Sequence, residues 1–194
     1  MRRWDHLDLS ARLGAQMGAK LKKILVVIDM QNDFIDGALG TAEAQAIVER
    51  VEAKIKTYPA DRIYATRDTH GENYMETQEG KRLPVPHCIR GSRGWQICDR
   101  IASAMPSAVI VDKPTFGSTA LAELLREENE KEELEIELAG LCTDICVVSN
   151  ALLLKAYLPE TAIRVDASCC AGVTPESHEA ALRTMGMCQI GIEI

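Results

Sequence analysis

The sequence predicts an α/β fold, a three-layer α/β/α sandwich with a mostly parallel six-stranded sheet. Short apolar runs alternate with amphipathic stretches along the chain, and most of the runs lack the in/out alternation of a half-exposed strand. Near-continuous apolar runs are typical of strands covered on both faces, and intervening helices favour right-handed crossovers into a parallel sheet. The length of 194 residues suits one such domain.

The first part of the chain, residues 1–20, stands apart from this pattern. Leu9, Leu13 and Met17 are spaced for one face of a helix, so we expect either a short amphipathic helix that docks on the domain or on a second subunit, or a frayed extension. The domain itself is expected to span residues 21–194. Its first elements are a strand at 24–29, a helix at 41–56 that opens with Thr41, a strand at 62–66 and a shorter helix at 95–104.

The second half of the chain continues the alternation. Ser118 and Pro175 stand at helix starts, where a hydroxyl cap and a first-turn proline are favoured, and Gly186 closes the last helix. The expected elements are a strand at 108–111, a helix at 118–130, a strand at 134–139, a helix at 143–157, a strand at 163–165, a helix at 175–186 and a strand at 189–194. Between the halves, residues 68–94 are too long and polar for an ordinary connection, so we expect them to form one wall of a functional site.

The composition excludes several classes of protein. With 22 Lys and Arg against 29 Asp and Glu, the net charge is −7, which disfavours nucleic acid and anionic membranes as partners. No apolar run approaches the roughly 20 residues that span a bilayer, and no secretory signal is recognisable, so we expect a cytoplasmic protein. The seven cysteines form no CxxC pair and are expected to be thiols.

Reactive side chains follow the predicted strands. Asp29, Lys113 and Cys146 come at or just after three strand ends, which meet at one edge of a parallel sheet. Thr143 or Asp144 is a good helix N-cap, so Cys146 falls in the first turn, where the helix dipole favours a thiolate. Asp29 could take the thiol proton, Lys113 could stabilise the charges, and the backbone N–H groups of Cys142 and Cys146 could face an oxyanion. Taken singly, these residues could equally be a strand cap, a solvated cation and a buried apolar thiol.

Asp68, His70 and His87 form a second group. An Asp-x-His pair after a strand, completed by a remote histidine, can make a three-ligand metal site with positions open for water or substrate. Alternatively, Asp68 caps a turn and both histidines line a polar loop. A weaker alternative pairs Asp29 with Asp144 as glycosidase-type carboxylates.

Four segments resemble the isochorismatase-like cysteine hydrolases. They are DMQNDF from Asp29, DKPTFGS around Lys113, GLCTDICV around Cys146, and RDTH followed by PHCIRG, which is similar to the nicotinamidase branch in particular. The resemblance runs from about Lys23 to the C-terminus. It implies the isochorismatase-like, Rossmann-like version of the predicted fold.

The resemblance also implies a chemistry. Asp29, Lys113 and Cys146 would form a catalytic triad whose thiolate attacks an amide carbonyl, with nicotinamide as the first candidate substrate. The Leu141–Cys142 peptide bond would be cis. Asp68, His70 and His87 would hold a divalent ion, zinc above all. We expect Phe34, Leu141 and Ile145 to contact the substrate, and the chain to form a dimer or tetramer.

Departures from the nicotinamidase pattern keep alternatives open. Pro84 and Ile145 stand where nicotinamidases usually have aromatic residues around the pyridine ring. An N-carbamoyl or ureido substrate, held by Arg90 or Arg93, is therefore the second enzymatic hypothesis. A metal- or thiol-responsive binding protein on the same scaffold is the non-enzymatic one. We expect His178, alone on a late helix, to be a solvated surface residue.

Overall fold

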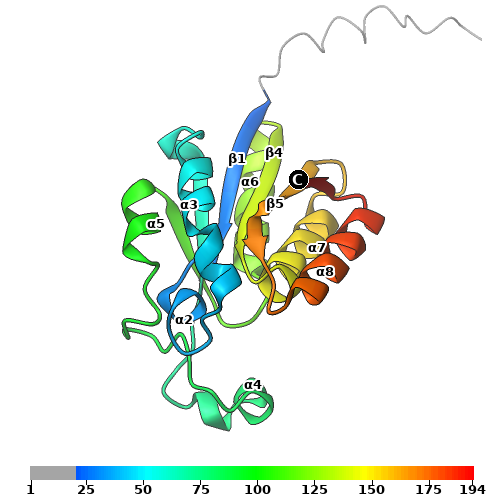
Figure 1. Ribbon diagram of the computed structural model, residues 1–194. Helices are drawn as coiled ribbons and strands as arrows, with labels where there is room; N and C mark the ends of the chain where they lie inside the picture. The colour runs from blue at the N-terminus through cyan, green and yellow to red at the C-terminus, as the bar shows by residue number, and fades with distance from the viewer. Residues whose placement is uncertain (1–20) are drawn as a thin grey trace, which may run out of the picture.

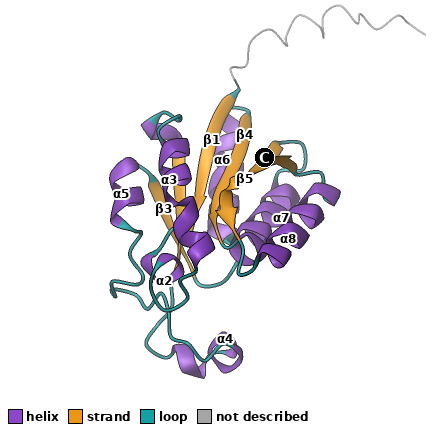
Figure 2. Ribbon diagram, in the orientation of Figure 1, coloured by secondary structure: helices purple, strands orange, loops and turns teal. Residues whose placement is uncertain are grey.

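The computed structural model describes residues 21–194 and confirms the predicted three-layer fold. The sheet has six strands in the order β3-β2-β1-β4-β5-β6, and every neighbouring pair is parallel. Helices cover both faces (Figures 1 and 2). The strands are β1 (Lys22–Ile28), β2 (Ile63–Asp68), β3 (Val109–Lys113), β4 (Leu134–Leu141), β5 (Ala162–Ala171) and β6 (Gly191–Glu193).

The helices fall into two layers and a loop region. Their bounds are α2 (Asn32–Ile35), α3 (Ala42–Ile55), α4 (Gln78–Arg82), α5 (Asp99–Ala104), α6 (Thr119–Lys131), α7 (Val148–Tyr157) and α8 (Pro175–Met187), with the short 3-10 turns η1 (Ala60–Arg62) and η2 (Tyr74–Glu76) and the π turn η3 (Thr143–Val147). Within residues 21–194, no helix is long and apolar enough to cross a bilayer. The helix predicted in residues 1–20 lies outside the described residues.

The central strand β1 explains why two helical layers are needed. Ile24, Val26 and Ile28 pack into a core formed with α6, α7 and α8, whereas Leu25 and Val27 pack into a second core formed with α3 and α5. All five side chains are at most 1% exposed. The unbroken apolar run at residues 24–28 therefore places side chains in the cores on both faces of the sheet, as expected for a buried parallel strand.

Several predicted bounds were wrong for local reasons. The expected helix at 143–157 begins with the π turn η3. The short helix starts at Asp99 instead of 95, because the preceding residues bond to the segment after β1: Cys98 N–H donates to the Met30 carbonyl at 2.9 Å. Strand β5 runs through Asp166 and Ser168, since Lys54 pairs with the Asp166 carboxylate at 2.7 Å and makes a charged residue tolerable there.

Gly140 allows β4 to run against the end of β1. Its φ is +126°, and a Cβ at this position would lie 2.1 Å from the Ile28 carbonyl oxygen. No L side chain fits this backbone, so the glycine determines how closely the two central strands approach just before Asp29.

We expect Gly140→Ala to lower the free energy of unfolding by about 3 kcal/mol or more, because it adds a backbone clash to an unfavourable φ. Gly91 is the matched control: its φ is +83°, but a Cβ there would meet nothing within 4 Å. Gly91→Ala should cost only about 1 kcal/mol. Urea unfolding of both variants measures the difference, and equal losses would contradict the close-approach argument.

Candidate active site

The structure brings Asp29, Lys113 and Cys146 together at the carboxyl edge of the sheet. Asp29 follows β1, Lys113 ends β3, and Cys146 lies in η3, the turn after β4. The Lys113 Nζ is 2.7 Å from the Asp29 Oδ2 and 3.4 Å from the Cys146 Sγ. All three residues are at most 4% exposed. The convergence expected from the strand ends is therefore present in the structure.

Asp29 is held in position by its neighbour on β2. The Thr66 hydroxyl donates to the Asp29 Oδ1 at 2.6 Å, and the Asp29 N–H donates back to the same hydroxyl oxygen at 3.3 Å. Burial raises the pKa of the Asp29 carboxyl, the Lys113 ammonium lowers it and the Asp68 charge raises it, with a net increase. A carboxylate with a raised pKa is a better proton acceptor than an exposed one.

Lys113 is a buried ammonium between two carboxylates. Besides Asp29, it contacts the Asp68 Oδ1 at 3.3 Å. Burial alone would lower the pKa of Lys113, but the carboxylates of Asp29 and Asp68 raise it well above its usual range. Lys113 therefore stays charged and fixes the relative positions of the acid and the thiol.

The thiol of Cys146 differs from the sequence-based expectation. Burial, followed by the charge of Asp29, raises its pKa well above the usual value, although the Lys113 ammonium opposes this. The helix terminus alone does not produce a resting thiolate. The residue at the N-cap of η3 is Cys142, which makes no side-chain cap. The capping role predicted for Thr143 or Asp144 is therefore wrong.

Thr143 and Asp144 instead attach the turn η3 to α8. The Thr143 Oγ1 and the His178 Nδ1 are 2.8 Å apart, and the Asp144 carboxylate accepts hydrogen bonds from the Ser177 hydroxyl and the Val173 N–H. His178 is thus partly buried and bonded, not a solvated surface residue as predicted. Asp144 is directed at α8, so its pairing with Asp29 as two catalytic carboxylates does not occur.

A cavity of about 580 Å³ opens above Cys146. Cys142 also lines it, and the Leu141–Cys142 peptide bond is cis, as expected. Both phenylalanines of the chain, Phe34 and Phe116, line the cavity, and so does Ile145. The full set of lining residues is Phe34, Leu39, Asp68, His70, Thr77, Gln78, Glu79, Arg82, Leu83, His87, Pro114, Thr115, Phe116, Cys142, Ile145 and Cys146.

Three of the expected contact residues are absent from this lining. Leu141 is fully buried in the core on the α3 side of the sheet, so it has no surface to offer a substrate. Arg90 and Arg93 do not line the cavity either. The Arg90 guanidinium pairs with Asp112 at 3.0 Å. The arginine that does line it is Arg82, which sequence reasoning missed.

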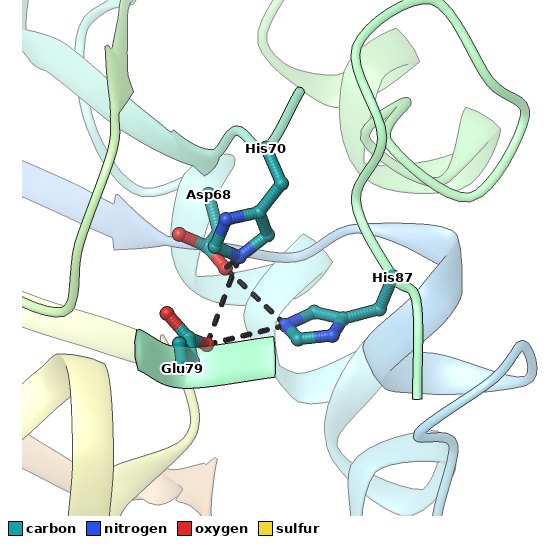
Figure 3. A group of neighbouring side chains, drawn as sticks. All are labelled: Asp68, His70, Glu79 and His87. Atoms are coloured by element: carbon teal, nitrogen blue, oxygen red, sulfur yellow. Dashed lines mark hydrogen bonds and ion pairs between the residues drawn. The ribbon is translucent and has the colours of Figure 1, made fainter. Parts of the chain in front are cut away.

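Asp68, His70 and His87 converge, and a fourth residue, Glu79, joins them (Figure 3). The His70 Nε2 is 2.9 Å from the Asp68 Oδ2 and the His87 Nε2 is 3.6 Å from it. Both Nε2 atoms lie 3.7 Å from the Glu79 Oε1. One ligand atom from each of the four residues lies within 4.8 Å of all the others.

The donor set fits a divalent ion. The His87 Nδ1 donates to the Val85 carbonyl oxygen at 2.9 Å, so loss of the other ring proton to a metal would leave an Nε2 lone pair directed at the group. Burial raises the pKa of Asp68, but the bonds from His70 and His87 and the Lys113 charge lower it far more, so a carboxylate is available. Two imidazoles and two carboxylates are ligands typical of zinc and similar metals.

Glu79 gave no signal in the sequence because it lies in α4, a helix inside the polar stretch between β2 and β3. Thr77 begins this helix, and its hydroxyl accepts a hydrogen bond from Gly80 N–H at 3.0 Å. The Tyr74 hydroxyl donates to the Leu83 carbonyl at 2.9 Å and closes the segment. The prediction that the long polar connection forms one wall of the site agrees with these positions.

A parallel α/β sheet with an acid, an amine and a thiol at its carboxyl edge is the arrangement expected of a cysteine hydrolase. Within this class, the chain matches the Isochorismatase domain over residues 23–193 and belongs to that family.

Known relatives cover almost the whole domain. An isochorismatase family protein of Bacillus subtilis is 29% identical over 173 residues, 84% of this chain and 93% of that protein. The nicotinamidase/pyrazinamidase of Mycobacterium tuberculosis is 26% identical over 179 residues, 84% of this chain and 94% of that protein. The crystal structure of a Pyrococcus horikoshii pyrazinamidase in complex with zinc has a TM-score of 0.73 and 26% identity, covering 89% of this chain and 99% of that one.

We expect the wild-type chain to bind one Zn²⁺ ion and His87→Ala to weaken this binding by about 100-fold, because it removes a ligand directed at the other three residues. Glu79→Gln should weaken it less, by about tenfold, since an amide oxygen remains. Isothermal titration with Zn²⁺ measures both. His178→Ala is the matched control, because its ring bonds to Thr143 instead. Equal affinities of His87→Ala and His178→Ala would rule out the four-residue group.

Proposed function

We propose that this chain is a cysteine amidohydrolase that cleaves a small carboxamide, with nicotinamide converted to nicotinate and ammonia as the leading reaction. The observation that carries the proposal is the buried contact of Lys113 with both Asp29 and Cys146 beside the cavity. The nicotinamidase and pyrazinamidase relatives support the choice of substrate.

The first half of the reaction forms a thioester. Asp29 accepts the proton of the Cys146 thiol, and the sulfur attacks the amide carbon. The oxygen of the tetrahedral intermediate takes up the negative charge, which the backbone N–H groups of Cys142 and Cys146 stabilise in our proposal. Asp29 then returns the proton to the amide nitrogen, the C–N bond breaks, and ammonia leaves.

The second half restores the thiol. Asp29 accepts a proton from water, and the hydroxide attacks the thioester carbon through a second oxyanion. When the C–S bond breaks, the thiolate recovers a proton from Asp29, and the carboxylic acid product releases its own proton to water and departs as its anion. Lys113 stays charged through both halves and holds the proton acceptor beside the sulfur. The alternation of one carboxylate between base and acid follows from its raised pKa.

Asp68, His70, Glu79 and His87 would hold the divalent ion, which we propose is zinc. When bound, it supplies a Lewis-acidic position for a ring nitrogen of the substrate. Phe34 and Ile145 line the cavity beside these residues and are proposed substrate contacts, and Phe116 is a further aromatic surface. A cytoplasmic location, a dimer or tetramer, and the division of the chain at residue 20 remain predictions.

We expect Cys146→Ala to lower the turnover of nicotinamide by about 10⁴-fold, because the nucleophile is lost while the cavity is kept. Ammonia release in a coupled assay measures it. Cys188→Ala is the control, because Cys188 is exposed at the C-cap of α8 and does not line the cavity. Unchanged turnover in Cys146→Ala would refute the assigned nucleophile. Absence of ammonia release from every amide in a panel that includes N-carbamoyl compounds would favour the non-enzymatic binding protein.

A further inference from the structure

Arg82 is the cavity residue that the proposed reaction leaves without a role. It is exposed at the surface end of the cavity, whereas Cys146 at the inner end is 4% exposed. Among residues 21–194, no carboxylate lies within ion-pair distance of its guanidinium. Arg67 and Arg90 differ, since both pair with Asp112, at 2.8 and 3.0 Å.

The helix α4 directs Arg82 toward the cavity. Glu79 and Arg82 are three residues apart, so they share one face of the helix. Glu79 fixes the orientation of that face, because its carboxylate lies 3.7 Å from both His70 and His87 (Figure 3). Arg82 therefore extends from the same face at the other end of this short helix.

Much of the cavity around the Arg82 guanidinium is apolar. Leu39, Leu83, Phe116 and Ile145 provide apolar walls between the inner and outer ends. A volume of about 580 Å³ lies well inside the range of pockets that hold ligands larger than a single ring amide. A ligand that fills it would place an amide at Cys146 and a second polar group near the outer end.

We propose that Arg82 is a specificity-determining residue that selects amides carrying a carboxylate at the end remote from the scissile bond. The planar guanidinium fork matches a carboxylate in a bidentate arrangement. The chain carries a net charge of −7, so an anionic substrate needs such a local cation to enter. ω-Amides of dicarboxylic acids belong to this substrate class. The inference rests on the proposed amidohydrolase function.

The test compares substrates that differ only in charge. Glutaramate carries an amide and a carboxylate, and pentanamide is its neutral counterpart. The measured quantity is the ratio of kcat/KM for glutaramate to kcat/KM for pentanamide. We expect Arg82→Gln to lower this ratio by about tenfold or more, since charge-assisted hydrogen bonds are lost, and Arg82→Lys to keep part of it. Lys81→Gln removes the same charge from an exposed neighbour that does not line the cavity, and it should leave the ratio unchanged.

Binding separates this inference from the proposed function. Titration of glutaramate into Cys146→Ala protein, with and without Arg82→Gln, reports recognition without turnover. A loss of affinity of about tenfold in the double variant, absent in the matched Lys81→Gln double variant, supports the role of Arg82 even if no amide is hydrolysed. Equal affinities, or an unchanged kcat/KM ratio in an enzyme that hydrolyses nicotinamide, would overturn the inference and leave the proposed function standing.

Discussion

The ammonium of Lys113 is the group on which the site depends. A buried cation is costly unless partners with good geometry surround it, and Lys113 has two carboxylates within 3.3 Å. Those carboxylates stand at the ends of β1 and β2, and Lys113 itself ends β3. One ion therefore connects three strand ends, and loss of any partner would leave an uncompensated charge in the interior. The position of the thiol beside Nζ then follows from the turn after β4.

Asp68 links this ion to the possible metal site. Its Oδ1 contacts Lys113 and its Oδ2 faces His70 and His87. A single carboxylate thus fixes the separation between the proposed reacting sulfur and the group that would hold the ion. Because both of its oxygens are engaged, Asp68 has little freedom to rotate, and the two halves of the site keep a constant relative position.

The sequence predicted the parts of the site that follow strands and missed those that do not. Asp29, Lys113 and Cys146 were predictable because parallel strands bring their carboxyl ends to one edge. Glu79 and Arg82 were not, since the five residues of α4 have no apolar periodicity and their helix forms against Tyr74 and Leu83. Burial of Leu141 was missed for a related reason: the observed β4 runs to Leu141, two residues beyond its predicted end, and the side chain enters the core.

The division between the sheet edge and the long connection has a chemical consequence. Asp29, Lys113 and Cys146 lie on strand ends and on a turn that hydrogen bonds attach to α8. Seven of the sixteen cavity-lining residues come from the segment between β2 and β3, where a change of sequence leaves Asp29, Lys113 and Cys146 in place. Ile145 stands where an aromatic residue is expected and lines the cavity with Phe116 and Arg82, whereas Pro84, at the other such position, does not line it. Substrate preference can therefore differ from that of its relatives while the amide chemistry stays the same.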